Sequence, residues 1–142
     1  MKSKLIMVGL MVIVALSLLA CAAPANEVSL EIPCDDFMKD KNLTWNVSGV
    51  SVGDSIKTTL CSNPTTGFKW ELAGISDQTV LKQDGEAEFM PPAEAIPGAG
   101  GKEIWTFKAL KQGTSQISLE YSRPWEGGEK AEWTFDINVT VE

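Results

Sequence analysis

Carboxylates and cysteines are the side chains of this sequence that could do chemistry. None of the 142 residues is histidine, so these groups lack a histidine partner. A Ser-His-Asp triad, a Cys-His pair and most catalytic zinc sites are therefore excluded. The carboxylate pairs Asp35 with Asp36 and Glu86 with Glu88 stand in polar stretches, where charges are usually solvated. A calcium site at Asp35, Asp36 and Asp40 lacks the glycine and the terminal glutamate of an EF-hand loop. We expect no enzyme, no metal and no cofactor.

The N-terminus has the pattern of an export signal. Lys2 and Lys4 precede an apolar run from Leu5 to Leu16, which is too short for a comfortable transmembrane helix. The end of this region, Leu18-Leu19-Ala20-Cys21, is similar to the lipobox of bacterial lipoproteins, in which the thiol is acylated and becomes the new N-terminus.

This pattern predicts three parts: a lipoprotein signal peptide over residues 1–20, a lipidated tether over 21–27 that starts at Cys21, and a domain over 28–142. Acyl chains would hold the exported protein to a membrane without a spanning helix, on the outer side of the cytoplasmic membrane or in the cell envelope. An ordinary signal peptide cut after Ala23, or an uncleaved anchor, is the alternative.

The charge balance limits the partners. Without Lys2 and Lys4, ten basic residues face nineteen acidic ones, a net charge of −9. A chain with no basic stripe is a poor ligand for nucleic acid, so we expect none as partner. The mature length suits one domain with one core, which we expect to be a monomer.

Alternation of apolar and polar residues dominates the chain after residue 27 and predicts β-strands. The clearest run is Trp133 to Val141, and the same pattern recurs at Val28–Ile32, Ile56–Leu60, Phe68–Leu72, Trp105–Ala109 and Ile117–Tyr121. Turn signals separate these runs, and no mature segment has a sustained helical period. We expect an all-β fold, a β-sandwich of seven or eight antiparallel strands.

The five tryptophans divide into two groups. Trp45, Trp70, Trp105 and Trp133 are expected in the core. Trp125 follows Arg123 and Pro124, where proline ends strand pairing and stiffens a loop, so its indole is expected at a loop tip. A lid over the end of the core is the alternative.

Two other loops have unusual composition. In Asn63-Pro64-Thr65-Thr66-Gly67, proline fixes one φ, glycine permits a positive φ and asparagine can cap the turn. The segment from Met90 to Lys102 holds three prolines and three glycines and is longer than a hairpin requires. Taken alone, the first is a simple connector and the second a flexible linker.

The three segments Asn63 to Gly67, Gly98 to Gly101 and Arg123 to Trp125, in this order with strands between them, resemble the binding loops of the chagasin-like inhibitors of papain-type cysteine peptidases. The resemblance covers about Val28 to Glu142. It implies an immunoglobulin-like sandwich whose loops cluster at one end and form a wedge.

The resemblance also implies a role for each loop. The first would enter the substrate cleft with Thr65 closest to the catalytic cysteine, the second would run along the cleft wall through main-chain hydrogen bonds, and Trp125 would pack on the catalytic histidine side. The predicted peptidase-binding residues are Asn63, Pro64, Thr65, Thr66, Gly67, Phe68, Gly98, Ala99, Gly100, Gly101, Arg123, Pro124 and Trp125.

The function so implied is reversible, competitive inhibition of a papain-like cysteine peptidase. The alternative is a cell-surface binding module of the same fold without inhibitory activity, since immunoglobulin-like sandwiches serve many functions.

Cys34 and Cys61 remain as a pair once Cys21 is assigned to lipid. In an exported protein an even number of thiols favours a disulfide, which would also steady the base of the first loop. Two free cysteines or a redox pair are the alternatives.

Overall fold

The computed structural model of the protein describes residues 24–37, 39–94 and 96–142. The predicted signal peptide over residues 1–20 and the predicted lipidation site Cys21 lie outside the described residues. Among the described residues, no helix has the length and apolarity that crossing a membrane requires.

The regular secondary structure of the described residues is almost entirely strand. They are β1 (Glu27–Glu31), β2 (Asn42–Val50), β3 (Ser55–Ser62), β4 (Lys69–Ile75), β5 (Leu81–Gln83), β6 (Glu88–Met90), β7 (Gly101–Ala109), β8 (Gly113–Ser122) and β9 (Trp133–Val141). One turn of α-helix, α1 (Cys34–Phe37), and one turn of 3-10 helix, η1 (Pro64–Thr66), complete the fold.

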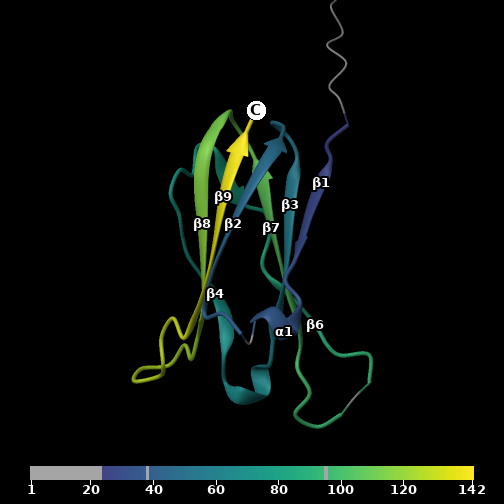
Figure 1. The fold of residues 1–142 in the computed structure, drawn as a ribbon, viewed down its shortest axis with the longest axis vertical. Coiled ribbons are helices and arrows are strands. Elements are labelled where there is room, and N and C mark those ends of the chain that lie inside the picture. Colours follow the sequence, from purple (N-terminus) through teal and green to yellow (C-terminus); the bar gives the residue numbers. More distant parts are fainter. Residues whose placement is uncertain (1–23, 38, 95) are drawn as a thin grey trace, which may run out of the picture.

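The strands form the two facing sheets of a sandwich (Figure 1). One sheet has the order β1-β3-β7-β5, with β6 also paired to β7, and the other has the order β2-β9-β8-β4. The predicted all-β sandwich is confirmed.

Two details of the prediction are wrong. β1 pairs with β3 and β2 pairs with β9 in parallel, where antiparallel pairing was expected throughout. Alternation of buried and exposed side chains is the same for both directions, so it carries no information on this point. The described residues also contain nine strands, because β5 and β6, of three residues each, are too short to produce an alternating pattern.

The core lies between the sheets and follows the predicted alternation. Strand β9 has the predicted bounds and buries Phe135, Ile137, Val139 and Val141 on one face. Trp70 and Trp105 are buried, while Trp45 and Trp133 are half-buried against the core, as expected for inward-facing residues. Burial of large apolar side chains is the main contribution to the stability of such a domain.

The two ends of the sandwich carry different parts of the chain. We call the end formed by α1 and the connections 63–68, 91–94, 96–100 and 123–132 the loop pole; it is the lower end in Figure 1. At the opposite end, the far pole, β1 begins beside the start of β3, with Glu27 paired to Ser55. The chain therefore enters the domain at the pole opposite to the three loops.

Candidate functional site

The first loop is a short, internally bonded turn between β3 and β4. The side-chain oxygen Oδ1 of Asn63 accepts hydrogen bonds from the backbone N–H of Thr65 (3.2 Å) and from its hydroxyl (2.6 Å). Gly67 has a φ of +81° and its N–H donates to the carbonyl of Pro64 (2.9 Å). Pro64, Thr65 and Thr66 are exposed, so the turn presents its tip to solvent in a fixed conformation.

The third loop is tied together at its base. The backbone N–H of Arg123 donates to the carbonyl of Glu129 (2.8 Å), and their side chains form an ion pair with Nη1 and Oε2 2.8 Å apart. Lys130 Nζ donates to the carbonyl of Arg123 (2.7 Å). Beyond this base, Trp125 is 52% exposed, which confirms the expected display of the indole at a loop tip.

Arg123 joins the third loop to the first. Its Nε donates to the carbonyl of Thr66 (3.3 Å), and its guanidinium lies 4.5 Å from the ring centroid of Phe68 and 5.9 Å from that of Trp125. The indole of Trp125 also covers Gly67, where a Cβ atom would overlap its Cη2. Only glycine fits here, both for its positive φ and for the indole above it.

Asn63 joins the middle loop to the first. Its Nδ2 donates to the carbonyl of Gly98 (3.0 Å), and Gly100 lies so close that an added Cβ would stand 3.0 Å from the carbonyl oxygen of Ser62. Gly98, with a φ of +80°, and Gly100 are exposed, Ala99 is half-buried, and Gly101 begins β7. The structure thus brings residues from all three predicted loops into one contiguous surface.

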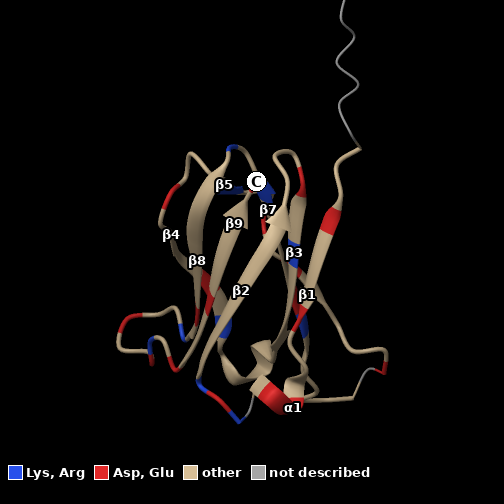
Figure 2. Cartoon of the chain, turned by 45° about the horizontal axis from the view of Figure 1, so that its top comes forward, with Lys and Arg blue, Asp and Glu red and all other residues tan. Residues whose placement is uncertain are grey.

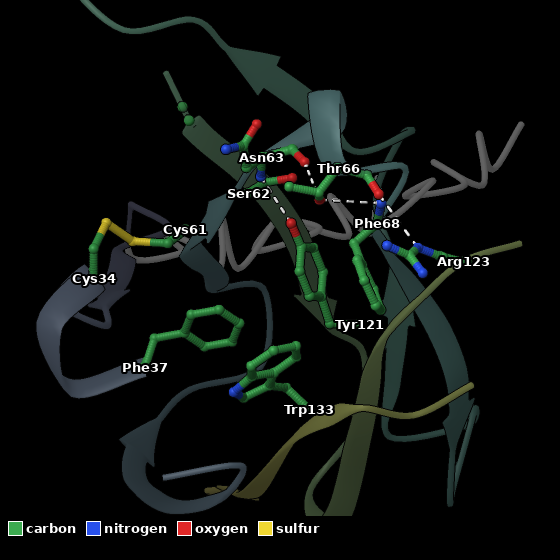
Figure 3. Close-up of a pocket in the computed structure, with 12 residues that line it drawn as sticks. Cys34, Phe37, Cys61, Ser62, Asn63, Thr66, Phe68, Tyr121, Arg123 and Trp133 are labelled. Atoms are coloured by element: carbon green, nitrogen blue, oxygen red, sulfur yellow. Dashed lines mark hydrogen bonds between the residues drawn. A yellow bond between two sulfur atoms is a disulfide. The ribbon is translucent and has the colours of Figure 1, made fainter. Parts of the chain in front are cut away.

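Beneath the loops, an aromatic cluster surrounds a cavity of about 580 Å³ (Figure 3). Tyr121, from β8, accepts a hydrogen bond from the backbone N–H of Asn63 through its hydroxyl (2.7 Å) and stacks on Phe68, with 5.3 Å between ring centroids. Phe37 and Trp133 complete the cluster from α1 and β9. The cavity is lined by these rings, by the cysteine pair and by residues of all three loops.

The predicted disulfide between Cys34 and Cys61 is present, with 5.4 Å between the Cα atoms. It joins the start of α1 to the end of β3, just before Asn63. The helix itself was not predicted, because four residues are too few to establish a helical period.

Supporting residues of the site were also missed. Glu103 is a buried carboxylate in β7 that accepts hydrogen bonds from Ser62 Oγ (2.5 Å) and from the backbone N–H of Trp70 (3.3 Å), bracing both strands that flank the first loop. The sequence signal for a buried Glu103 was its place in the same alternation as the inward-facing Trp105 and Phe107. Nothing in the sequence pattern marked Tyr121 or Glu129 as supports of the loops.

Charges at the loop pole are of mixed sign (Figure 2). Acidic residues lie on α1, and both signs of charge occur along the connection that contains Glu126, Glu129 and Lys130. The candidate pairs Asp35 with Asp36 and Glu86 with Glu88 are exposed, in line with solvated carboxylates. Among the described residues, no cluster of acidic and cysteine side chains is arranged to hold a metal ion.

Two carboxyl groups have clearly lowered pKa values, and both belong to turns remote from the loop pole. Backbone N–H groups of Asn26 and Ser51 donate to Asp54 and hold its pKa below the ordinary value. The hydroxyl and then the backbone N–H of Thr79 do the same for Asp77. Recognition of a partner at the loop pole would therefore depend on the shape of this surface, on its exposed backbone groups and on the indole of Trp125.

Residues 49–139 match the family described as "Chagasin family peptidase inhibitor I42". Chagasin of Trypanosoma cruzi is 36% identical over 80 residues, which cover 55% of this chain and 73% of that protein. Amoebiasin-2 of Entamoeba histolytica is 38% identical over 92 residues, which cover 65% of this chain and 74% of that protein.

Solved structures share the fold. The crystal structure of the cysteine protease inhibitor EhICP2 from Entamoeba histolytica superposes with a TM-score of 0.61 at 24% identity, covering 85% of this chain and 100% of that one. PbICP-C, solved in complex with falcipain-2, superposes with a TM-score of 0.55 at 23% identity, covering 81% of this chain and 99% of that one. The binding role of each loop residue stays a prediction, since these likenesses concern the fold.

Proposed function

This chain belongs to the chagasin family of peptidase inhibitors, and we propose that it inhibits papain-like cysteine peptidases by inserting the loop pole into the active-site cleft. Membership of a family of inhibitors agrees with the expectation from the sequence that the chain is not an enzyme. A relative of the same fold has been captured with falcipain-2, which supports a peptidase as the partner.

The observation that carries the proposal is the bonding between the three loops. Asn63 bonds to Gly98 and Arg123 bonds to Thr66, so segments far apart in the sequence form one preassembled wedge. Preassembled loops lose little conformational entropy on binding. A standard interface buries about 1,600 Å² in total, which a wedge of three loops can supply without further segments.

The first loop is shaped to resist cleavage. A peptidase of this type binds its substrate as an extended chain, but Pro64 to Thr66 form a turn of 3-10 helix that ends at the left-handed Gly67. Asn63 holds this turn from within, so the chain presents Thr65 without offering an extended peptide bond to the catalytic thiol. Inhibition by this loop is therefore reversible, competitive and non-covalent.

Titration of papain with the soluble chain that starts at Ala22 tests the proposal, with hydrolysis of a fluorogenic peptide as the readout. The proposal predicts saturable inhibition near a one-to-one ratio that more substrate overcomes. Absence of inhibition with several papain-like enzymes, by a sample shown to be folded, would contradict it and support a binding module without inhibitory activity.

We also propose that the inhibitor is exported and held at a membrane by acyl chains on Cys21, acting there as a monomer. The proposal rests on the apolar run and the Leu18-Leu19-Ala20-Cys21 pattern. The mass of the mature N-terminal peptide from membranes tests it: a diacylated or triacylated Cys21 is expected, and an unmodified peptide beginning at Pro24 would contradict it.

A further inference from the structure

Helix α1 lies against β3, the strand that leads into the first loop, and is attached to that strand covalently. The disulfide links Cys34, at the start of the helix, to Cys61, two residues before Asn63. Cys34 and Phe37 precede residue 49, so they lie outside the span that matches the family. The α1 side of the attachment therefore lies outside the part matched to the family, while Cys61 lies within it.

Phe37 carries the contact from the helix into the domain. Its side chain is 6% exposed and its ring centroid lies 5.4 Å from that of Trp70, 5.6 Å from that of Tyr121 and 5.4 Å from that of Trp133. These are ordinary distances for favourable aromatic pairs. Trp70 in turn donates from Nε1 to the carbonyl of Cys61 (2.9 Å), so the disulfide and the rings hold the same strand end.

The rings that Phe37 contacts are those that fix the loops. Tyr121 bonds to the backbone of Asn63 and stacks on Phe68. Phe68 lies under the guanidinium of Arg123, which bonds to Thr66. A continuous path of contacts thus runs from α1 to the bases of the first and third loops (Figure 3).

The cavity explains why these contacts matter for the position of the loops. Cys34 and Phe37 form part of its wall, and Asn63, Thr66 and Arg123 form another part. The bases of the loops therefore border an open pocket on this side instead of close-packed side chains, which leaves room for rearrangement. Without the helix the cavity loses a wall, and the loops lose the support that it provides.

We propose that α1 and the Cys34–Cys61 disulfide form a brace that holds the first and third loops in their binding conformation, with Phe37 and the two cysteines as positioning residues. The inference rests on the proposed function, since it concerns the affinity of the same site. The brace acts by reducing the freedom that the loops lose on binding.

The test compares the native chain with two variants, Cys34→Ala/Cys61→Ala and Phe37→Ala. The first removes the covalent link and the second removes the aromatic contact. Each variant should raise the inhibition constant for papain roughly tenfold. Binding would then have to order one or two more side chains and a short loop, and the entropy lost corresponds to about that factor in affinity. Activated papain is separated from its reducing agent by gel filtration before the assay, so that the native disulfide stays intact.

Hydrogen exchange supplies a readout that does not involve a peptidase. The amide of Asn63, which donates to Tyr121, should exchange faster in both variants, while amides of β8 and β9 remain protected. Val80→Ala is the matched control, because Val80 is a buried residue of the β4–β5 connection, remote from the loops. It should lower the overall stability while leaving the inhibition constant and the exchange at Asn63 unchanged.

The outcomes separate the two proposals. If the native chain inhibits papain and both variants inhibit it equally well, with unchanged exchange at Asn63, the brace is refuted and the proposed function stands. If the native chain does not inhibit papain, the proposed function fails, and exchange at Asn63 still decides whether the brace orders the loop. A variant whose β8 and β9 amides lose their protection from exchange is unfolded, and the other variant then carries the comparison.

Discussion

At the scale of single residues, Gly67 and Trp125 share one space at the tip of the loop pole. The indole covers the position that a Cβ of residue 67 would occupy, and Gly67 itself has a positive φ. The orientation of the indole therefore depends on the absence of a side chain in a different loop.

Gly67→Ala should weaken inhibition of papain by more than tenfold, because the methyl group displaces the indole. The left-handed backbone alone costs an alanine about 1 to 2 kcal/mol of stability. Gly85→Ala is the control, since Gly85 has a similar φ of +79° and open space around it. Equal inhibition constants for the two variants would show that contact with Trp125 is unimportant.

Trp125→Ala should weaken inhibition by about 30-fold, which corresponds to about 2 kcal/mol for a tryptophan at the centre of an interface. Its unfolding midpoint in urea should stay near that of the native chain, since the indole is half-exposed. Val52→Ala, at an equally exposed apolar side chain of the far pole, should change neither quantity. Unchanged inhibition by Trp125→Ala would remove this loop from the account.

At the scale of elements, sequence reasoning succeeded where one face of a strand is buried over its length. The alternation in Trp133 to Val141 was enough to predict β9 with its bounds. Strand β2 was missed although Leu43, Trp45 and Val47 alternate, because Gly49, with a φ of +75°, and a shift in register before Val50 interrupt the pattern.

The loops of the candidate site could be predicted from the sequence, but the hydrogen bonds between them could not. Turn chemistry identified Asn63 and Gly67, and proline placed Trp125 in a loop. The bonds from Asn63 to Gly98 and from Arg123 to Thr66 depend on the order of strands in the two sheets, which alternation does not determine. The same holds for the ring of Phe37, which reaches the site only because a disulfide places α1 there.

The junction of β1 with the turn after β2 gives a prediction about pH. Asp54 accepts hydrogen bonds from Asn26 and Ser51, so its folded pKa lies below its unfolded value of about 3.9. Its contribution to stability is therefore complete above the unfolded pKa and is lost as the pH falls through the folded pKa.

Asp54→Asn should lower the urea midpoint at pH 7, and the difference from the native chain should shrink below about pH 4. The control is Asp84→Asn, at an exposed carboxylate, which should have little effect at either pH. A difference for Asp54→Asn that is the same at pH 7 and pH 3 would contradict the role assigned to the ionised carboxylate.

At the scale of the whole molecule, the entry of the chain and the proposed binding surface lie at opposite poles. β1 begins at the far pole and the three loops lie at the other end of both sheets (Figure 1). A protein attached to a membrane ahead of β1 would thus direct its loops away from that surface.

The full lipidated chain in phospholipid vesicles should inhibit soluble papain with the same inhibition constant as the chain that starts at Ala22. Vesicles without protein are the control for adsorption of the peptidase. A marked loss of inhibition on attachment would mean that the membrane covers the loop pole, against the start of β1 at the far pole.

The central claim, that the loop pole occupies the peptidase cleft, is tested most directly by alkylation of the catalytic thiol of papain with iodoacetamide. The cysteines of the described domain are joined in a disulfide and do not consume the reagent. One equivalent of the chain from Ala22 should slow alkylation in a saturable manner, and Trp125→Ala should protect less at the same concentration. Alkylation at an unchanged rate, while the chain is bound to papain, would place the contact outside the cleft and contradict the account.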